Sequence, residues 1–376
     1  MQASNDATQL TLDPVRRPFP FGRVTLRNRC AMSPMTRQFS PGGLPGPDVA
    51  AYYAVRAAAG VGLIITEGVY VDHPSAGKPD AAPALRPDTA DAWRQVVDAV
   101  HEQGGAIIPQ LWHVGNYRRV AAGDPAPGLG PEAITEAGET VVLAMNQADI
   151  DATVAAFARS ARIAIDCGFD GVEIHGGHGY MLDQFHWERT NNRQDAYGGT
   201  LENRFRLSCE VVRAVRAEIG PDWPIVFRLS QWKMSDYEAR ILQDVGELQQ
   251  VAAMLTEAGV DVFDISARRF WLPAFEEGGP SLAALFRAAS GRPVIAVGSV
   301  GLDKPSVSRH ERTAETMKAV PVGIENASAA LAAGEFDLFA AGRTLLADPR
   351  WLEKILAGRL EELVPVTSAA YARLVT

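Results

Sequence analysis

Cysteine is scarce in this sequence. Only three of its 376 residues are cysteines, and Cys30, Cys167 and Cys209 form no C-x-x-C pair. An odd number without that spacing argues against a disulfide framework and against a zinc ribbon. Each cysteine lies in or beside an apolar run, so we expect small buried thiols in a reducing, cytoplasmic setting.

Long apolar runs and an excess of positive charge are missing too. No stretch approaches the roughly 18 apolar residues of a membrane span, and residues 1–13 lack the apolar core of a signal peptide. Lys and Arg number 36 against 45 Asp and Glu, which gives a net charge of −9. An acidic surface repels phosphate backbones and anionic lipids, so we expect neither a nucleic acid nor a membrane as partner.

What the sequence does contain is a repeated alternation of a short apolar run with a longer helical run. The apolar runs, which we interpret as strands, are 29–33, 61–66, 106–110, 171–174, 225–229, 262–265, 293–297 and 338–341. The helical runs include 48–59, 89–103, 150–167, 201–219, 244–258, 323–333 and 346–357. Nearly continuous apolar strands indicate a parallel sheet covered by helices on its outer face. Eight alternations favour a single closed (β/α)₈ TIM barrel over an open doubly wound sheet.

The junctions between these elements carry two recurring features. Glycines Gly60, Gly168 and Gly259 precede strands, where they would end the preceding helix in the left-handed conformation. Polar residues such as Gln110 and His175 follow strands. In a barrel all strand carboxyl ends open on one face, and that face holds the active site.

Three longer segments lie outside this alternation. Segments 114–149, rich in Gly and Pro, and 266–285 follow strands, so we expect long loops over the carboxyl-terminal face that shape substrate access. Segment 303–320 is polar and is predicted to be mobile, and residues 1–10 are predicted to form a disordered tail ahead of a barrel domain over 11–376.

The most informative segment is His175-Gly-Gly-His178-Gly-Tyr180, directly after an apolar strand. Two histidines three residues apart can face one cavity if the chain turns at the intervening glycines. Ordinary loop side chains are one alternative. A zinc site of His113, His175 and His178 is another, but no acidic ligand stands at a suggestive spacing, and we expect no metal.

With its surroundings, this segment resembles the Old Yellow Enzyme family of FMN-dependent NAD(P)H oxidoreductases and ene-reductases. The resemblance covers nearly the whole barrel. Its matching stretches are 32–37, Tyr53 with Arg56, 60–68, 110–115, 175–185 and 191–204, together with Arg228, Gly298, Gly342 and Arg343. The run 195–204 is long, specific and correctly placed.

The resemblance implies a tightly but non-covalently bound FMN at the barrel mouth. The residues that it assigns to the cofactor are Pro34, Met35, Thr36, Gly68, Gln110, Arg228, Gly298, Gly342 and Arg343. Gln110 would bond the pyrimidine edge of the flavin, and Arg228 would stabilise the negative charge of the reduced ring. Arg343 would pair with the phosphate near Gly298 and Gly342. Thr36 stands where one branch of the family has cysteine and another has threonine.

The resemblance also implies the reaction. His175 and His178 would bind the carbonyl or nitro oxygen of an activated alkene, and Tyr180 would protonate the α-carbon after hydride reaches the β-carbon. The sequence has no Gly-x-Gly-x-x-Gly after a strand; NAD(P)H would enter the same pocket as a transient co-substrate, with ping-pong kinetics. A homodimer is compatible with this interpretation.

The chain departs from its relatives around the pocket. Asn116 replaces the usual Arg, and segments 231–237 and 268–271 differ from the commoner loops. We expect Trp112, Phe270 and Trp271 as pocket walls, with core packing an equal alternative for Trp112.

Three other functions are alternatives to this interpretation. A multidomain flavoenzyme with an iron–sulfur centre needs a cysteine cluster, and no cysteine follows Cys209. A flavin carrier or sensor has no use for the proton donor Tyr180. A metal-dependent barrel hydrolase would be colourless, whereas a flavoprotein absorbs visible light.

Overall fold

The centre of the molecule is a closed barrel of parallel strands in the order β10-β11-β12-β13-β3-β4-β5-β9. The computed structural model describes residues 11–78, 80–120, 124–303 and 323–376. The barrel strands are β3 (Cys30–Met32), β4 (Leu63–Tyr70), β5 (Ala106–Trp112), β9 (Val172–His175), β10 (Ile225–Ser230), β11 (Val262–Ser266), β12 (Val294–Val297) and β13 (Leu338–Ala341). Each overlaps its predicted strand, which confirms the (β/α)₈ fold. The predicted tail, residues 1–10, and all but the first residue of the predicted mobile segment 303–320 lie outside the described residues.

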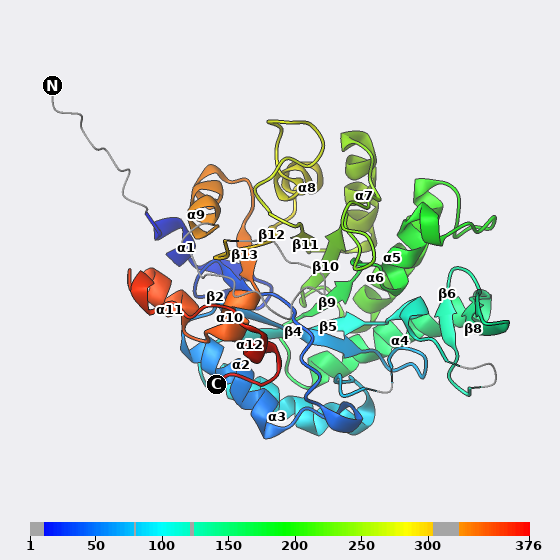
Figure 1. Ribbon diagram of the computed structural model, residues 1–376, viewed down its shortest axis with the longest axis horizontal. Helices are drawn as coiled ribbons and strands as arrows, with labels where there is room; N and C mark the ends of the chain where they lie inside the picture. The colour runs from blue at the N-terminus through cyan, green and yellow to red at the C-terminus, as the bar shows by residue number, and fades with distance from the viewer. Residues whose placement is uncertain (1–10, 79, 121–123, 304–322) are drawn as a thin grey trace.

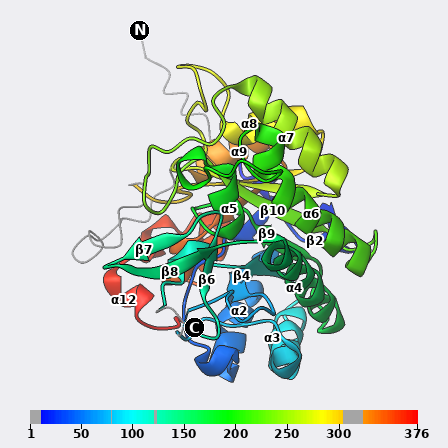
Figure 2. The same ribbon diagram turned by 90° about the vertical axis from the view of Figure 1, so that its right-hand side faces the viewer.

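Helices surround this barrel (Figures 1 and 2). They are α2 (Pro47–Ala58), α3 (Ala90–His101), α4 (Gln147–Asp166), α6 (Leu201–Ile219), α7 (Val245–Ala258), α8 (Leu282–Ser290), α9 (Ile324–Ala333) and α11 (Trp351–Leu356). The glycines before strands have the predicted positive φ: 95° at Gly60, 94° at Gly168 and 120° at Gly259. No helix in the described residues is both long and apolar enough to span a bilayer.

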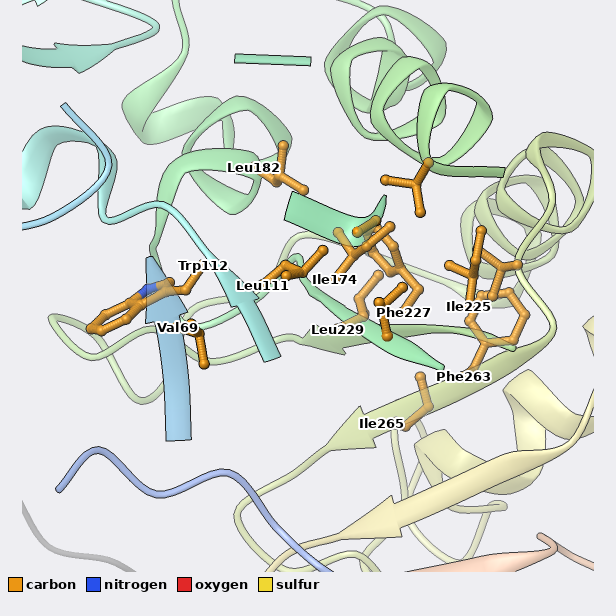
Figure 3. Packing of buried hydrophobic residues seen from close by; sticks show 14 of the residues in the cluster. Val69, Leu111, Trp112, Ile174, Leu182, Ile225, Phe227, Leu229, Phe263 and Ile265 are labelled. Carbon is orange, nitrogen blue, oxygen red and sulfur yellow. The ribbon is translucent and has the colours of Figure 1, made fainter. Parts of the chain in front are cut away.

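Alternate residues of the barrel strands point outward, into the hydrophobic core beneath the helices, or inward, into the interior of the barrel. Side chains of successive strand residues point to opposite faces, so Ile174, Phe227 and Phe263 pack outward in the layer between strands and helices (Figure 3). Their neighbours in sequence therefore point into the barrel. These inward residues are Glu173 and His175 on β9, Arg228 on β10, and Asp264 and Ser266 on β11.

A short hairpin closes the other end of the barrel. Strands β1 (Phe19–Phe21) and β2 (Val24–Leu26) pair antiparallel. Their side chains Phe19, Phe21 and Leu26 pack in one cluster with the inner residues Leu63 and Val226 near the amino ends of the barrel strands. Because the hairpin covers the amino ends, the carboxyl ends are the ones that can open toward a ligand.

Three predictions about secondary structure need correction. The helix expected over 346–357 is two helices, α10 (Arg343–Ala347) and α11, because Asp348 precedes Pro349 and is extended, with φ −132° and ψ 98°. Segment 266–285 is not all loop: α8 starts within it, after Ser281, whose hydroxyl accepts from the Ala284 N–H at 3.2 Å.

The segment 114–149 also contains regular structure. Strands β6 (Gly128–Gly130), β7 (Ile134–Glu136) and β8 (Glu139–Ala144) form a small sheet. Strands β7 and β8 are joined at Ala137 and Gly138, with φ of 50° and 86°, which is the pattern of a tight hairpin turn. The three cysteines are buried and free, as predicted.

Candidate active site

A cavity of about 730 Å³ opens at the carboxyl ends of the barrel strands. This size suits a small-molecule or cofactor site. The residues proposed from the sequence that line it are Pro34, Met35, Thr36, Gln110, Trp112, His175, His178, Tyr180, Arg228, Gly298, Gly342 and Arg343. Distant parts of the chain therefore converge as the barrel requires.

Three of the proposed residues do not line the cavity. A Cβ atom on Gly68 would lie 2.5 Å from the Cε3 atom of Trp112, so this glycine makes room for the tryptophan ring. Phe270 is 2% exposed and packs edge-on against Phe336, with ring centroids 5.6 Å apart. Trp271 packs against Phe270 at 5.1 Å and so lies beside the core.

A buried polar cluster lies beneath the cavity. The amide Nε2 of Gln110 donates to Oε1 of Glu173 at 2.7 Å, and Nη1 of Arg228 donates to Oδ2 of Asp264 at 2.7 Å. Glu173 and Asp264 are both fully buried, and Oε2 of Glu173 and Oδ1 of Asp264 accept no hydrogen bond within the described part of the chain. Burial, and next the charge of Asp264, raise the pKa of Glu173 well above its usual value. The raised pKa favours a proton on Glu173, which would leave a single negative charge, on Asp264, opposite Arg228.

Arg228 also faces the cavity. Its Nη atoms lie 3.3 and 3.4 Å from the Oγ atom of Ser33, and its Nε finds no hydrogen-bond partner within the described part of the chain. A buried donor left without a partner is costly. The cavity thus offers a fixed positive charge with an unused donor, which suits an electron-rich heterocycle.

His175 and His178 lie together at the cavity wall, with ring centroids 5.1 Å apart. Burial, and next the charge of Arg228, lower the pKa of His175 to about 3. The same two causes lower the pKa of His178 well below its usual value. Both imidazoles are therefore neutral at physiological pH, and each carries one N–H donor.

The backbone of His178 has a left-handed conformation, with φ of 63°, which is uncommon for a residue other than glycine. Several contacts hold it. Its N–H donates to Oγ of Ser230 at 2.9 Å, and its Nε2 is hydrogen-bonded to Oγ of Ser266 at 3.0 Å. The ring of Trp232 lies 4.3 Å from the imidazole. The position of His178 is thus fixed through its backbone N–H, its Nε2 atom and its ring.

Tyr180 belongs to an aromatic wall beside this pair. Its ring centroid lies 5.2 Å from that of His175, 4.9 Å from that of Trp112 and 5.4 Å from that of Tyr117. Tyr180 directly precedes helix α5 (Met181–His186). The wall brings a phenol close to two neutral imidazoles, an arrangement that can bind an oxygen and deliver a proton.

The ends of β12 and β13 bring small residues to the same cavity. Gly298 has φ of 152°, and a Cβ there would lie 2.5 Å from the carbonyl oxygen of Ala267. Gly342 precedes Arg343, which is the first residue of α10. Gly298, Gly342 and Arg343 all line the cavity. An arginine beside glycines at adjacent strand ends suits a phosphate. Together with Gln110 and the unpartnered Nε of Arg228, these residues fit the groups of FMN.

Several lining residues were missed from the sequence. They include Ser266, Trp232, Met234, Tyr117 and Lys78. Ser266 ends strand β11 and could have been found by the same strand-end rule that found His175. Trp232 and Met234 lie in the segment 231–237, which was noted as unusual but was given no place in the pocket.

The chain resembles proteins of one family over most of its length. The model of the family described as "NADH:flavin oxidoreductase / NADH oxidase family" matches residues 15–362. The 12-oxophytodienoate reductase 2 of Arabidopsis thaliana is 40% identical over 221 residues, covering 56% of this chain and 59% of that protein. The match therefore spans less than two thirds of the plant relative's length.

The fold is also similar to that of solved structures over nearly the whole chain. The old yellow enzyme homologue from Zymomonas mobilis is 27% identical with a TM-score of 0.75, over 95% of this chain and 96% of that one. Morphinone reductase in complex with tetrahydroNAD is 26% identical with a TM-score of 0.76, over 95% and 93% of the two chains.

Proposed function

The chain belongs to the NADH:flavin oxidoreductase / NADH oxidase family of FMN-binding, NAD(P)H-oxidising enzymes, and on that premise we propose that it is an ene-reductase acting on activated C=C bonds. The names of two relatives, a 12-oxophytodienoate reductase and a morphinone reductase, denote reductases of oxo compounds. The substrates proposed are therefore enones first, with enals and nitroalkenes as chemically similar cases. The three buried free cysteines support a reducing, cytoplasmic location.

In this proposal the lining residues divide between cofactor and substrate. Gln110 and Arg228 would hold the polar edge of the flavin, Thr36 would contact the ring as well, and Arg343 would hold the phosphate. When bound, FMN would supply the hydride for the reaction, and NAD(P)H would restore it. The carboxylate of Asp264 at 2.7 Å keeps the guanidinium of Arg228 oriented, so the positive charge needs no reorganisation when negative charge develops nearby.

The two neutral histidines act on the substrate oxygen. As hydride adds to the β-carbon, negative charge moves to the carbonyl or nitro oxygen, and N–H groups of His175 and His178 stabilise it more in the transition state than in the ground state. Their neutrality matters because a neutral imidazole donates a hydrogen bond without giving up its proton. Burial, and next the charge of Arg228, lower the pKa of both rings and keep them in this form.

Tyr180 then delivers a proton to the α-carbon. A phenol is a weak acid, but it is adequate for a strongly basic enolate-like carbon. NAD(P)H and the alkene would use the same cavity in turn, which gives ping-pong kinetics.

The observation that carries the proposal is the cluster of His175, His178 and Tyr180, with ring centroids 5.1 and 5.2 Å from His175, on a cavity that also contains Arg228. Purified protein should absorb in the flavin bands and release FMN when denatured. NADPH added without oxygen should bleach these bands, and 2-cyclohexenone should restore them. A colourless protein would overturn the proposal, and a flavin that NADPH reduces but no alkene reoxidises would favour a carrier or an oxidase of another kind.

A further inference from the structure

A buried ion pair joins two segments that flank the cavity. Nζ of Lys233 lies 2.7 Å from Oδ1 of Asp183, and both side chains are 0% exposed. Lys233 belongs to the segment 231–237 after β10, and Asp183 belongs to α5. Burying two charges has a desolvation cost that often cancels their attraction, so apolar residues of similar size can be equally stabilising. Stability alone is therefore a weak reason for this pair.

Asp183 reaches the segment that bears the proposed donors. Its Oδ2 atom accepts from the backbone N–H of Gly179 at 2.6 Å. Gly179 stands between His178 and Tyr180 with φ of 85°. The carboxylate thus fixes the peptide that sets the direction of both side chains.

His186, which is hydrogen-bonded to Ser208, makes a further contact with the carboxylate of Asp183. Nδ1 of His186 lies 3.5 Å from Oδ1 of Asp183, and its Nε2 is hydrogen-bonded to Oγ of Ser208 at 2.7 Å. Burial raises the pKa of Asp183, but the charge of Lys233 and the neighbouring His186 outweigh this effect and bring the pKa below its usual value. Asp183 is therefore an anion, able to accept from Gly179 and Lys233 together.

The two residues that flank Lys233 in the sequence contact His178. The backbone N–H of Met234 donates to the carbonyl oxygen of His178 at 3.2 Å. The ring of the other neighbour, Trp232, contacts that of His178 in a tilted arrangement, with centroids 4.3 Å apart. Fixing the ammonium group of Lys233 therefore fixes the loop that covers His178.

We propose that Lys233 and Asp183 form a positioning pair that sets His178 and Tyr180 relative to each other. The inference rests on the proposed function of those two residues. Neither Lys233 nor Asp183 lines the cavity, so the pair acts through its neighbours and does not touch substrate. It ties the unusual segment 231–237 to the reaction, a role that the motifs of the sequence do not assign to it.

The test replaces the pair by apolar residues and measures each half-reaction of the holoenzyme. In Lys233→Met/Asp183→Leu we expect FMN content close to that of the unaltered protein and a modestly lower unfolding temperature, because the Gly179 N–H loses its acceptor. Reoxidation by 2-cyclohexenone should slow roughly tenfold to a hundredfold, since small displacements of acting groups have effects of this size. Reduction by NADPH, which needs no proton from Tyr180, should slow much less.

Conservative and control variants make the test specific. In Lys233→Met/Asp183→Asn the amide oxygen can still accept from Gly179, so part of the lost reoxidation rate should return; this variant also decides the matter if the apolar one does not fold. The pair of Lys354 with Asp348, at 2.8 Å, lies away from the cavity, and Lys354→Met should leave both half-reactions unchanged.

Two outcomes would overturn the proposal. One is an unchanged reoxidation rate in both double variants. The other is a parallel fall of both half-reactions, FMN content and unfolding temperature, which would indicate a merely structural pair. An unaltered protein that reduces no alkene would instead refute the proposed function and leave the geometry of the pair as it is.

Discussion

His175 and Arg228 are direct partners across strands β9 and β10. The pleat points both side chains into the barrel, so a permanent positive charge lies beside an imidazole that is only 5% exposed. Burial, and then this charge, lower the pKa of His175 to about 3. Burial of the ring, together with the pairing of two adjacent strands that brings Arg228 beside it, thus keeps a proposed substrate-binding group neutral.

The first prediction concerns pH and activity. Since His175 stays neutral at every pH above about 3, the rate of reoxidation by an alkene should show no histidine titration near pH 6.5. Because the unfolded chain binds this proton with a pKa of about 6.5, the group lowers stability progressively as the pH falls from there toward 3. Stopped-flow rates between pH 5 and 8 test the first statement. A rate that follows a pKa between 6 and 7 in the unaltered protein, and loses it in His175→Asn, would contradict it.

A second prediction concerns Glu67, whose Oε2 accepts from the N–H groups of Arg37 at 2.6 Å and Gln38 at 2.9 Å. Burial raises the pKa of Glu67 from 4.5 to about 7. The folded protein therefore holds a proton that the unfolded chain has lost, and stability falls as the pH rises from about 4.5 to about 7. The full shift corresponds to about 3 kcal/mol.

Glu67→Gln should remove most of this decrease of stability with rising pH. Urea unfolding at pH 5 and at pH 8 gives the change in unfolding free energy with pH, and we expect this change to differ between variant and unaltered protein by about 2–3 kcal/mol. Glu361→Gln, at an exposed position, serves as control. Equal slopes in all three proteins would show that Glu67 is ionised in the folded state.

A third prediction concerns Gly68. In Gly68→Ala the new Cβ would lie 2.5 Å from Cε3 of Trp112, so the ring must shift, which changes its contacts with Tyr70 and Tyr180 at 5.0 and 4.9 Å. Overpacking of this kind costs about 1–3 kcal/mol. We expect a lower unfolding temperature and slower reoxidation by alkenes. The control Gly246→Ala, in the first turn of α7, should change neither the unfolding temperature nor the reoxidation rate. A Gly68→Ala protein with native reoxidation kinetics would show that the position of Trp112 does not affect the reaction.

A fourth prediction concerns the histidine pair. In His175→Ala/His178→Ala a phenol, titrated into the FMN-loaded protein and followed by flavin absorbance, should bind at least a hundredfold more weakly, since both N–H donors to its oxygen are gone. Flavin content should stay near that of the unaltered protein. His101→Ala, on α3 beside Asp170, is the matched control. Undiminished phenol binding would mean that the anion site lies elsewhere in the cavity.

Much of the fold and part of the site could be predicted from the sequence. Gln110, His175 and Arg228 were found because each ends an apolar strand, and a closed barrel brings strand ends together whatever their separation in sequence. The break at Asp348 was missed although the local rule for a residue before proline predicts it. These features depend on neighbours along the chain or on the topology alone.

The remaining features depend on how loops fold back. Phe270 and Trp271 were expected in the pocket because they follow β11, but the loop turns Phe270 into the core against Phe336. The pairing of Lys233 with Asp183 joins residues 50 positions apart, and no local pattern indicates it. Sequence shows that a side chain is aromatic or charged, while its direction is set by contacts between segments that are distant in the chain.

The most direct test of the proposed mechanism is a comparison of the two half-reactions in Tyr180→Phe. Loss of a general acid typically costs about 10²–10⁴-fold in the proton-transfer step. Tyr117→Phe, on the same aromatic wall with its ring 5.4 Å from that of Tyr180, is the control for loss of a hydroxyl group.

In anaerobic stopped-flow experiments, flavin reduction by NADPH in Tyr180→Phe should stay within about threefold of the unaltered rate, while reoxidation by 2-cyclohexenone should slow by at least a hundredfold. Such a split would support Tyr180 as the proton donor beside the His175–His178 oxygen site. Equal slowing of the two half-reactions, or none in either, would contradict it.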